Sequence, residues 1–155
     1  TFTFALPREK KQEIITSSPN EVVVRTDVEE PWAGCTLLVV DDLEMFHLYA
    51  SMLMASAKEI LSAYNGEEGV EMARRFRPDI ILMDMRMPIL NGYEAIARIK
   101  KDPTMKDIPI IAVTAQAMEE DKDLCFQAGA ESYATKPIDR KFLTQEVRRL
   151  LKDSR

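Results

Sequence analysis

Five polar residues follow strand-like stretches of the sequence, and their types suit the transfer of a phosphoryl group. They are three carboxylates, a hydroxyl and an ammonium group: Asp41, Asp42, Asp84, Thr114 and Lys136. Three carboxylates held together repel one another, and at neutral pH they do not all stay ionised without a cation. Oxygen-only ligands select a hard ion, Mg²⁺ or Mn²⁺. A lysine and a threonine can then bind phosphoryl oxygens while a carboxylate attacks the phosphorus.

Each of these residues also has an ordinary structural interpretation. An Asp-Asp pair after a strand is often a turn or a helix cap, and a single aspartate or threonine there is often a cap. The dipeptide Lys136-Pro137 alone is typical of a loop. Their joint occurrence at four strand ends favours a functional site over these separate explanations.

The segments that must position these residues alternate regularly from Thr36 onward. We expect strands at 37–40, 59–63, 80–83, 110–113 and 132–135. We expect helices at 44–56, 65–75, 91–101, 119–128 and 139–152. Asn65 and Asn91 each stand three residues before a glutamate, which is the spacing of a helix cap, and Asp139 can cap the last helix.

This alternation predicts the fold class. Runs that are apolar on both faces belong to parallel strands covered by helices on both sides, so we expect a doubly wound α/β sheet. The carboxyl ends of such strands line one crevice, where ligands bind. The polar residues should therefore converge, although the chain separates them widely.

Composition excludes several classes of function. A length of 155 residues predicts one domain with a short appendage. A net charge of −5 without a run of Lys or Arg argues against direct nucleic-acid binding. No apolar stretch reaches the roughly 18 residues that span a membrane, so we expect no membrane contact by this segment. Two distant cysteines, Cys35 and Cys125, indicate a reducing, cytoplasmic compartment and no zinc site. A membrane anchor elsewhere in a parent chain stays open.

From Thr36 to about Lys152 the sequence resembles the receiver (response-regulator) domain of two-component signalling. The resemblance rests on L-L-V-V-D-D at 37–42, I-I-L-M-D-M-R-M-P at 80–88 with Gly92 after it, I-I-A-V-T-A at 110–115, and A-G-A at 128–130 leading to K-P at 136–137. It implies a flavodoxin-like sheet of five βα units with the strand order 2-1-3-4-5, as is known for this family.

The resemblance also implies an acceptor and a metal site. Asp84 would be the phosphoacceptor and would form an acyl phosphate. Mg²⁺ would be bound directly by Asp42, by Asp84 and by the backbone carbonyl of Arg86. Asp41 would hold a water molecule of the metal.

The remaining site residues have implied roles as well. Lys136 would pair with one phosphoryl oxygen, and Thr114 would bind another and shift toward it. Tyr133 matches the aromatic switch that moves inward as Thr114 moves. Arg86 and Gln116 occupy positions that tune the lifetime of the phosphate in this family.

The first residues resemble a different domain. The stretch T-F-T-F-A-L-P at 1–7 is similar to the closing strand of a histidine-kinase ATP-binding domain. The chain starts at Thr1 and not at Met, so we expect a fragment of a longer protein. Because the kinase-like stretch precedes a receiver, the resemblance implies a hybrid histidine kinase. Residues 1–35 would be the tail end of the kinase ATP-binding domain plus a linker, and residues 36–155 the receiver. The alternative is an unrelated N-terminal extension.

The expected partners are the dimerisation and phosphotransfer helices of a histidine kinase, or a histidine phosphotransfer protein; a homodimer is also considered. The segment 45–54 holds more apolar residues than one helix stripe needs. This excess indicates either additional core or a docking face. We interpret His47, the only histidine, as a surface or interface residue of this helix and neither a phosphate donor nor a ligand.

Two other functions compete with a phosphoacceptor. A haloacid-dehalogenase-like phosphatase also uses a strand-end aspartate, Mg²⁺, a threonine and a lysine. That class needs a second aspartate two residues after the nucleophile, where this sequence has Arg86. A degenerate receiver would act only as a protein-binding module, which the complete set of five site residues disfavours. The segment itself would have at most self-phosphorylation and autodephosphorylation activity.

Overall fold

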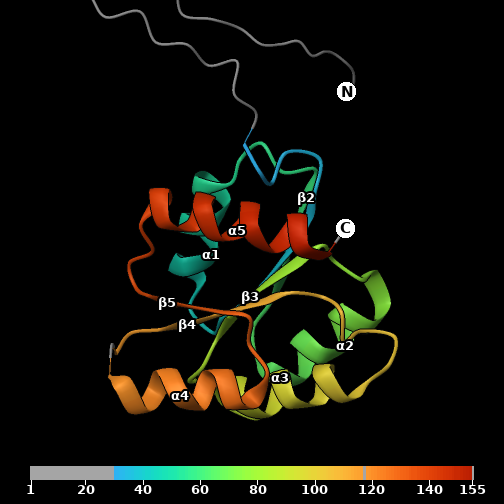
Figure 1. The fold of residues 1–155 in the computed structure, drawn as a ribbon, viewed down its shortest axis with the longest axis vertical. Helices are drawn as coiled ribbons and strands as arrows, with labels where there is room; N and C mark the ends of the chain where they lie inside the picture. The colour runs from blue at the N-terminus through green and yellow to red at the C-terminus, as the bar shows by residue number, and fades with distance from the viewer. Residues whose placement is uncertain (1–29, 117, 155) are drawn as a thin grey trace, which may run out of the picture. The chain divides into compact units, whose positions relative to one another are not determined.

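The computed structural model describes residues 30–116 and 118–154, and there five strands alternate with five helices (Figure 1). The strands are β1 (Thr36–Val40), β2 (Glu59–Ala63), β3 (Ile80–Asp84), β4 (Ile110–Thr114) and β5 (Ser132–Thr135). The helices are α1 (Glu44–Leu53), α2 (Gly66–Phe76), α3 (Gly92–Lys101), α4 (Glu119–Ala128) and α5 (Arg140–Ser154). The expected alternation is confirmed. The strand predicted near residues 1–6 lies outside the described residues.

The five strands form one parallel sheet in the order β2-β1-β3-β4-β5. This is the predicted flavodoxin-like order. The register aligns the carboxyl ends of the central strands. The pairs next to the polar residues are Val40 with Met83, Asp84 with Val113, and Thr114 with Thr135. Each polar residue therefore lies at or directly after a paired strand end, which brings residues from distant parts of the chain to one edge of the sheet.

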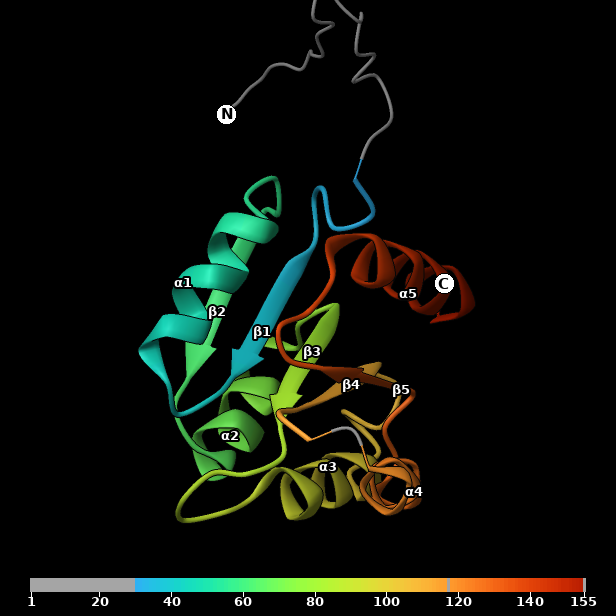
Figure 2. The same ribbon diagram turned by 90° about the vertical axis from the view of Figure 1, so that its left-hand side faces the viewer.

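Helices cover both faces of the sheet, as Figure 2 shows, with α1 and α5 on one side and α2, α3 and α4 on the other. Successive residues of a strand point to opposite faces. In β1, Leu38 and Val40 belong to the core under α2 and α3, whereas Leu37 and Val39 belong to the core under α1 and α5. Burial on both faces explains why the strands are continuously apolar.

The predicted helix caps are present and fix where α2, α3 and α5 begin. The side-chain oxygens of Asn65 and Asn91 accept hydrogen bonds from the backbone three residues ahead, at 2.8 and 3.0 Å. Asp139 accepts one from the backbone N–H of Phe142 at 2.9 Å. Such bonds satisfy N–H groups that have no partner within the helix.

Helix α1 ends earlier than the sequence predicted, at Leu53 and not near Ser56. The guanidinium of Arg140 donates a hydrogen bond of 3.0 Å to the carbonyl of Leu53, which satisfies an acceptor at the helix end. Three residues further on, Ala57 forms a bridge with Ala33. A contact from α5 and a contact from the N-terminal side thus terminate this helix.

The segment just before β1 packs into the domain. Trp32, within the range expected as a linker, has no exposed surface and belongs to the core under α1 and α5. The guanidinium of Arg140 lies 5.7 Å from the centre of its ring. The carbonyl of Cys35 accepts a hydrogen bond of 2.9 Å from the backbone of Lys58. Within the described part of the chain, no helix has the length and apolar character needed to cross a membrane.

Candidate functional site

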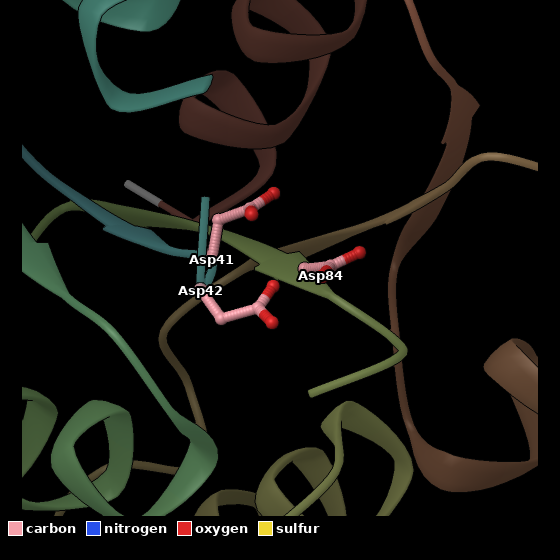
Figure 3. Close-up of side chains that lie close together, drawn as sticks. All are labelled: Asp41, Asp42 and Asp84. Atoms are coloured by element: carbon pink, nitrogen blue, oxygen red, sulfur yellow. The ribbon is translucent and has the colours of Figure 1, made fainter. Parts of the chain in front are cut away.

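Three carboxylates gather where β1 and β3 end (Figure 3). Asp41 and Asp42 directly follow β1, and Asp84 is the last residue of β3. One oxygen of each lies within 4.8 Å of the others. Asp41 is fully buried and Asp84 is 6% exposed, whereas Asp42 is exposed to solvent. The structure thus brings together the three carboxylates that the sequence predicted to converge.

Lys136 reaches this cluster from the end of β5. Its Nζ lies 2.6 Å from Oδ2 of Asp41 and 3.7 Å from Oδ1 of Asp84. The ring of Phe46 lies 4.6 Å from the same Nζ and backs it on one side. The backbone N–H of Lys136 donates a 2.8 Å hydrogen bond to the carbonyl of Thr114, which ties the loop after β5 to β4. One ammonium group therefore faces two buried carboxylates.

The cluster holds the carboxyl group of Asp84 in an unusual state. Its pKa is raised from 3.8 to about 6, chiefly by burial, then by the nearby carboxylate of Asp41 and, to a smaller extent, by Asp42. The ammonium of Lys136 and a hydrogen bond from the backbone of Arg86 oppose these effects. Removing a carboxylate from water and placing it beside another disfavours its charged form. The protein around the cluster therefore supplies too little positive charge to keep all three carboxylates ionised.

This set of donors fits a hard divalent cation. All three side chains offer oxygen, and Lys136 alone does not balance three negative charges. Oxygen ligands suit Mg²⁺ or Mn²⁺ and do not suit zinc, which takes nitrogen and sulfur more readily. The carboxyl oxygens of Asp41, Asp42 and Asp84 could hold such an ion at the solvent-facing side of the cluster, where Asp42 is exposed.

The hydroxyl of Thr114 stands at the end of β4, the strand next to Asp84. Thr114 is buried, and its Oγ1 accepts a 3.2 Å hydrogen bond from the backbone N–H of Gln116. The hydroxyl of Tyr133 donates a 2.9 Å hydrogen bond to the carbonyl of Gln116. Thr114 and Tyr133 are thus linked through the backbone of one residue of the β4–α4 loop.

Arg86 spans two loops beside the cluster. Its Nη2 donates a 2.9 Å hydrogen bond to Oε1 of Gln116 and lies 4.0 Å from Oδ2 of Asp121 on α4. Arg86 follows β3 by two residues, and Gln116 follows β4 by two. The side-chain pair therefore bridges the two loops that flank Asp84.

The family described as the response regulator receiver domain matches residues 37–148. The chain belongs to the response regulator receiver family. Protein PilH of Pseudomonas aeruginosa is 41% identical over 117 residues, which cover 74% of this chain and 96% of PilH. The polar-differentiation response regulator DivK of Brucella anthropi is 36% identical over 120 residues, covering 77% of this chain and 98% of DivK. The predicted family is confirmed.

Solved receiver structures share the fold of this receiver. One is the receiver domain of a sensor histidine kinase from Pseudomonas aeruginosa with a magnesium ion coordinated in its active-site cleft. It is 34% identical, with a TM-score of 0.71, and covers 77% of this chain and 99% of its own. Another is the signal receiver domain of a histidine kinase from Syntrophus aciditrophicus, at 27% identity and a TM-score of 0.70, covering 77% of this chain and 92% of its own.

Gly92 keeps the loop after β3 close to the carboxylate cluster. A Cβ atom at this position would clash with the backbone carbonyl oxygen of Asp84 and with Met85. The backbone N–H of Gly92 donates a 3.1 Å hydrogen bond to the carbonyl of Met85. Only glycine allows the start of α3 to approach the end of β3 so closely.

The expected surface position of His47 was wrong. It is 4% exposed, and its Nε2 lies 2.7 Å from the carbonyl oxygen of Asp41. Its ring faces that of Tyr64, with the ring centres 4.3 Å apart. The interpretation as a surface residue relied on its position on the first helix.

Proposed function

We propose that this receiver accepts a phosphoryl group from a phosphohistidine onto Asp84 in the presence of Mg²⁺. The observation that carries the proposal is the convergence of three carboxylates and one ammonium group at adjacent strand ends. The magnesium ion in the related sensor-kinase receiver supports it. After the transfer, the domain would change conformation or pass the phosphoryl group onward.

The acceptor in this reaction is a carboxylate oxygen of Asp84. It forms a bond to phosphorus as the bond between phosphorus and the imidazole nitrogen of the donor breaks, and that nitrogen keeps the electron pair. Lys136, already 3.7 Å from Asp84, binds an oxygen of the incoming phosphoryl group. Thr114 donates its hydroxyl hydrogen to another oxygen. The product is an acyl phosphate on Asp84.

The residues that would hold the ion are Asp42, Asp84 and the backbone carbonyl of Arg86, with Asp41 holding one of its waters. When bound, Mg²⁺ neutralises negative charge that the phosphoryl oxygens and the carboxylates bring together. The chain itself supplies the arrangement. Asp41 is fixed by Lys136 at 2.6 Å and by the backbone N–H of Leu43, which donates to its Oδ1 at 2.8 Å.

The conformational response would begin at Thr114 and Tyr133. A new anion on Asp84 would accept the hydroxyl hydrogen of Thr114 and draw this side chain toward it, away from the backbone N–H of Gln116 that now donates to its oxygen at 3.2 Å. A shift of Thr114 would disturb the loop whose carbonyl now holds the hydroxyl of Tyr133. A local charge change would thereby reach the face formed by α4 and β5. Arg86 and Gln116 would set how long the phosphate lasts, because their side chains bridge the flanking loops.

The proposed donor is a helix that carries a phosphohistidine, from a histidine kinase or a histidine phosphotransfer protein. Its proposed docking face is the exposed apolar side of α1 together with the residue after the acidic pair: Leu43, Met45, Leu48 and Met52. This face adjoins the site, because Leu43 directly follows Asp42. Large apolar side chains grouped on a surface are typical of protein contacts. An amphipathic helix fits such a surface.

The proposed context is a hybrid histidine kinase in the cytoplasm. The kinase-like stretch at 1–7, which lies outside the described residues, supports a kinase domain upstream of this receiver. The same proposal includes neither direct nucleic-acid binding nor membrane contact by this segment, in keeping with its acidic charge of −5. Arg86, where a phosphatase of the haloacid-dehalogenase class has an aspartate, favours an acceptor over a hydrolase.

The test is the intact mass of the protein after incubation with acetyl phosphate, a small phosphoryl donor. We expect a gain of one phosphoryl group that requires Mg²⁺. Asp84→Asn should abolish the gain, whereas Asp107→Asn, a change at an exposed carboxylate, should leave it intact. A gain of equal size in Asp84→Asn would refute the assignment of the acceptor.

A further inference from the structure

His47 makes one directional contact with the acidic cluster. Its Nε2 lies 2.7 Å from the carbonyl oxygen of Asp41, inside the protein. A carbonyl only accepts hydrogen bonds, so Nε2 must carry the hydrogen and donate it. The other ring nitrogen, Nδ1, is buried and has no hydrogen-bond partner in the described part of the chain. The ring is therefore oriented toward Asp41 by this single bond.

The carbonyl that receives this bond belongs to the peptide joining Asp41 and Asp42. The orientation of that peptide plane determines where the next residue projects its side chain. The carboxylate of Asp41 has its own supports, from Lys136 and from the backbone of Leu43. The carboxylate of Asp42 is exposed, and in residues 30–116 and 118–154 no hydrogen bond holds it. Its direction depends on the backbone that His47 fixes.

The ring of His47 is itself supported from behind. The ring of Tyr64, just after β2, lies 4.3 Å away between centres. The hydroxyl of Tyr64 donates a 2.9 Å hydrogen bond to Glu44 at the start of α1, and its backbone N–H donates one of 2.7 Å to Glu68. These contacts limit the rotation of the imidazole, so its N–H stays aimed at the peptide.

Packing alone does not account for a histidine here. A buried nitrogen without a partner lowers stability, because its hydration in the unfolded chain is not replaced. An apolar side chain of similar size would fill the space without that loss. What such a side chain cannot provide is the N–H that reaches the carbonyl of Asp41.

We propose that His47 is a positioning residue that holds the Asp41–Asp42 peptide so that the carboxylate of Asp42 faces Asp84 and the metal. This inference rests on the proposed function, because it assigns His47 a part in the affinity of that site for Mg²⁺. His47 acts through the backbone and contacts neither the ion nor the phosphoryl group.

Two substitutions separate the N–H group from the volume of the ring. In His47→Gln the side-chain amide can place an N–H near the position of Nε2, whereas His47→Leu removes the donor and keeps an apolar side chain. Isothermal titration of the folded protein with Mg²⁺ gives the affinity. We expect His47→Leu to bind Mg²⁺ about tenfold more weakly, which is the usual scale for residues that orient a ligand. His47→Gln should restore most of that loss, and Ser51→Gln, at an exposed position of α1 outside the proposed docking face, should bind as the wild type does.

A second readout uses no metal. In the metal-free protein, the amide resonance of Asp42 should move in His47→Leu and keep its wild-type position in His47→Gln. Urea unfolding distinguishes the positioning role from a packing role. A packing role predicts that His47→Leu loses stability while its Mg²⁺ affinity stays unchanged. That result, or equal affinity in both variants, overturns the inference. If the wild type binds no Mg²⁺, the proposed function itself fails. A failure confined to the His47 variants, in a wild type that binds Mg²⁺, concerns only the role of His47.

Discussion

Replacing Asp84 with asparagine should stabilise the metal-free receiver, although it destroys the proposed acceptor. The pKa of Asp84 stands at about 6 against an ordinary 3.8, first because the carboxyl group is buried and then because Asp41 lies beside it. One pKa unit corresponds to about 1.36 kcal/mol, so ionising this group in the folded protein costs roughly 3 kcal/mol. An amide of the same shape carries no charge and avoids this cost. We expect the free energy of unfolding to rise by about 1 to 3 kcal/mol at pH 7.

The same reasoning fixes the pH dependence. At a pH below 3.8, Asp84 is protonated in both the folded and the unfolded chain and contributes no difference. Between 3.8 and about 6 the unfolded chain releases this proton first, so the contribution of Asp84 to stability falls as the pH rises. Above about pH 6 the full penalty applies. The advantage of Asp84→Asn should therefore vanish in acid and reach a plateau near neutrality.

Urea unfolding followed by the fluorescence of Trp32, the only tryptophan, measures this effect. Trp32 is fully buried in the core under α1 and α5, so its emission reports the loss of that core. Asp107→Asn, at an exposed carboxylate, is the matched control and should change stability by less than about 0.5 kcal/mol. Added Mg²⁺ should stabilise the wild type more than Asp84→Asn, because only the wild type has all three carboxylates. A variant less stable than the wild type at pH 7 would refute the electrostatic reasoning.

Further variants test the other parts of the site. Lys136→Met leaves the buried Asp41 without its cation, so the metal-free protein should lose about 3 kcal/mol of stability in urea unfolding. Its rate of phosphorylation, measured by intact mass, should fall about a hundredfold. Arg86→Ala opens the bridge between the flanking loops and should shorten the phosphate lifetime several-fold, measured as phosphate release. Its unfolding free energy should change by less than about 0.5 kcal/mol, because Arg86 is largely exposed. Gly92→Ala forces a side chain against the carbonyl of Asp84 and should cost about 2 kcal/mol of stability. An unchanged lifetime, rate or unfolding midpoint would contradict the respective assignment.

The sheet and the convergence of the site could be predicted because the signals are local. Strands buried on both faces are continuously apolar, and the sequences of β1, β3 and β4 show this pattern. Asn65 and Asn91 cap their helices through contacts within four residues of chain. Because parallel strands place their carboxyl ends together, the position of each polar residue in the sequence was enough to bring it to the site.

Features that depend on contacts between distant elements could not be predicted in the same way. The end of α1 is set by Arg140 of α5, and no local pattern records that contact. The burial of His47 depends on Tyr64, which comes from the end of another strand. Trp32 stands in a polar, acidic stretch that is typical of a linker, yet the core accepts its ring. In each case tertiary packing overrode the local sequence character.

The account depends most directly on the identity of the acceptor side chain. Borohydride reduction of the phosphorylated protein converts an acyl phosphate into an alcohol, which marks the modified residue for peptide mapping. Trypsin releases Asp84 on a different peptide from Asp41 and Asp42, because Arg75 and Arg86 flank it. We predict that the mark falls on Asp84 and appears only when Mg²⁺ was present during phosphorylation. A mark on Asp41 or Asp42, or equal labelling without the metal, would contradict the proposed site.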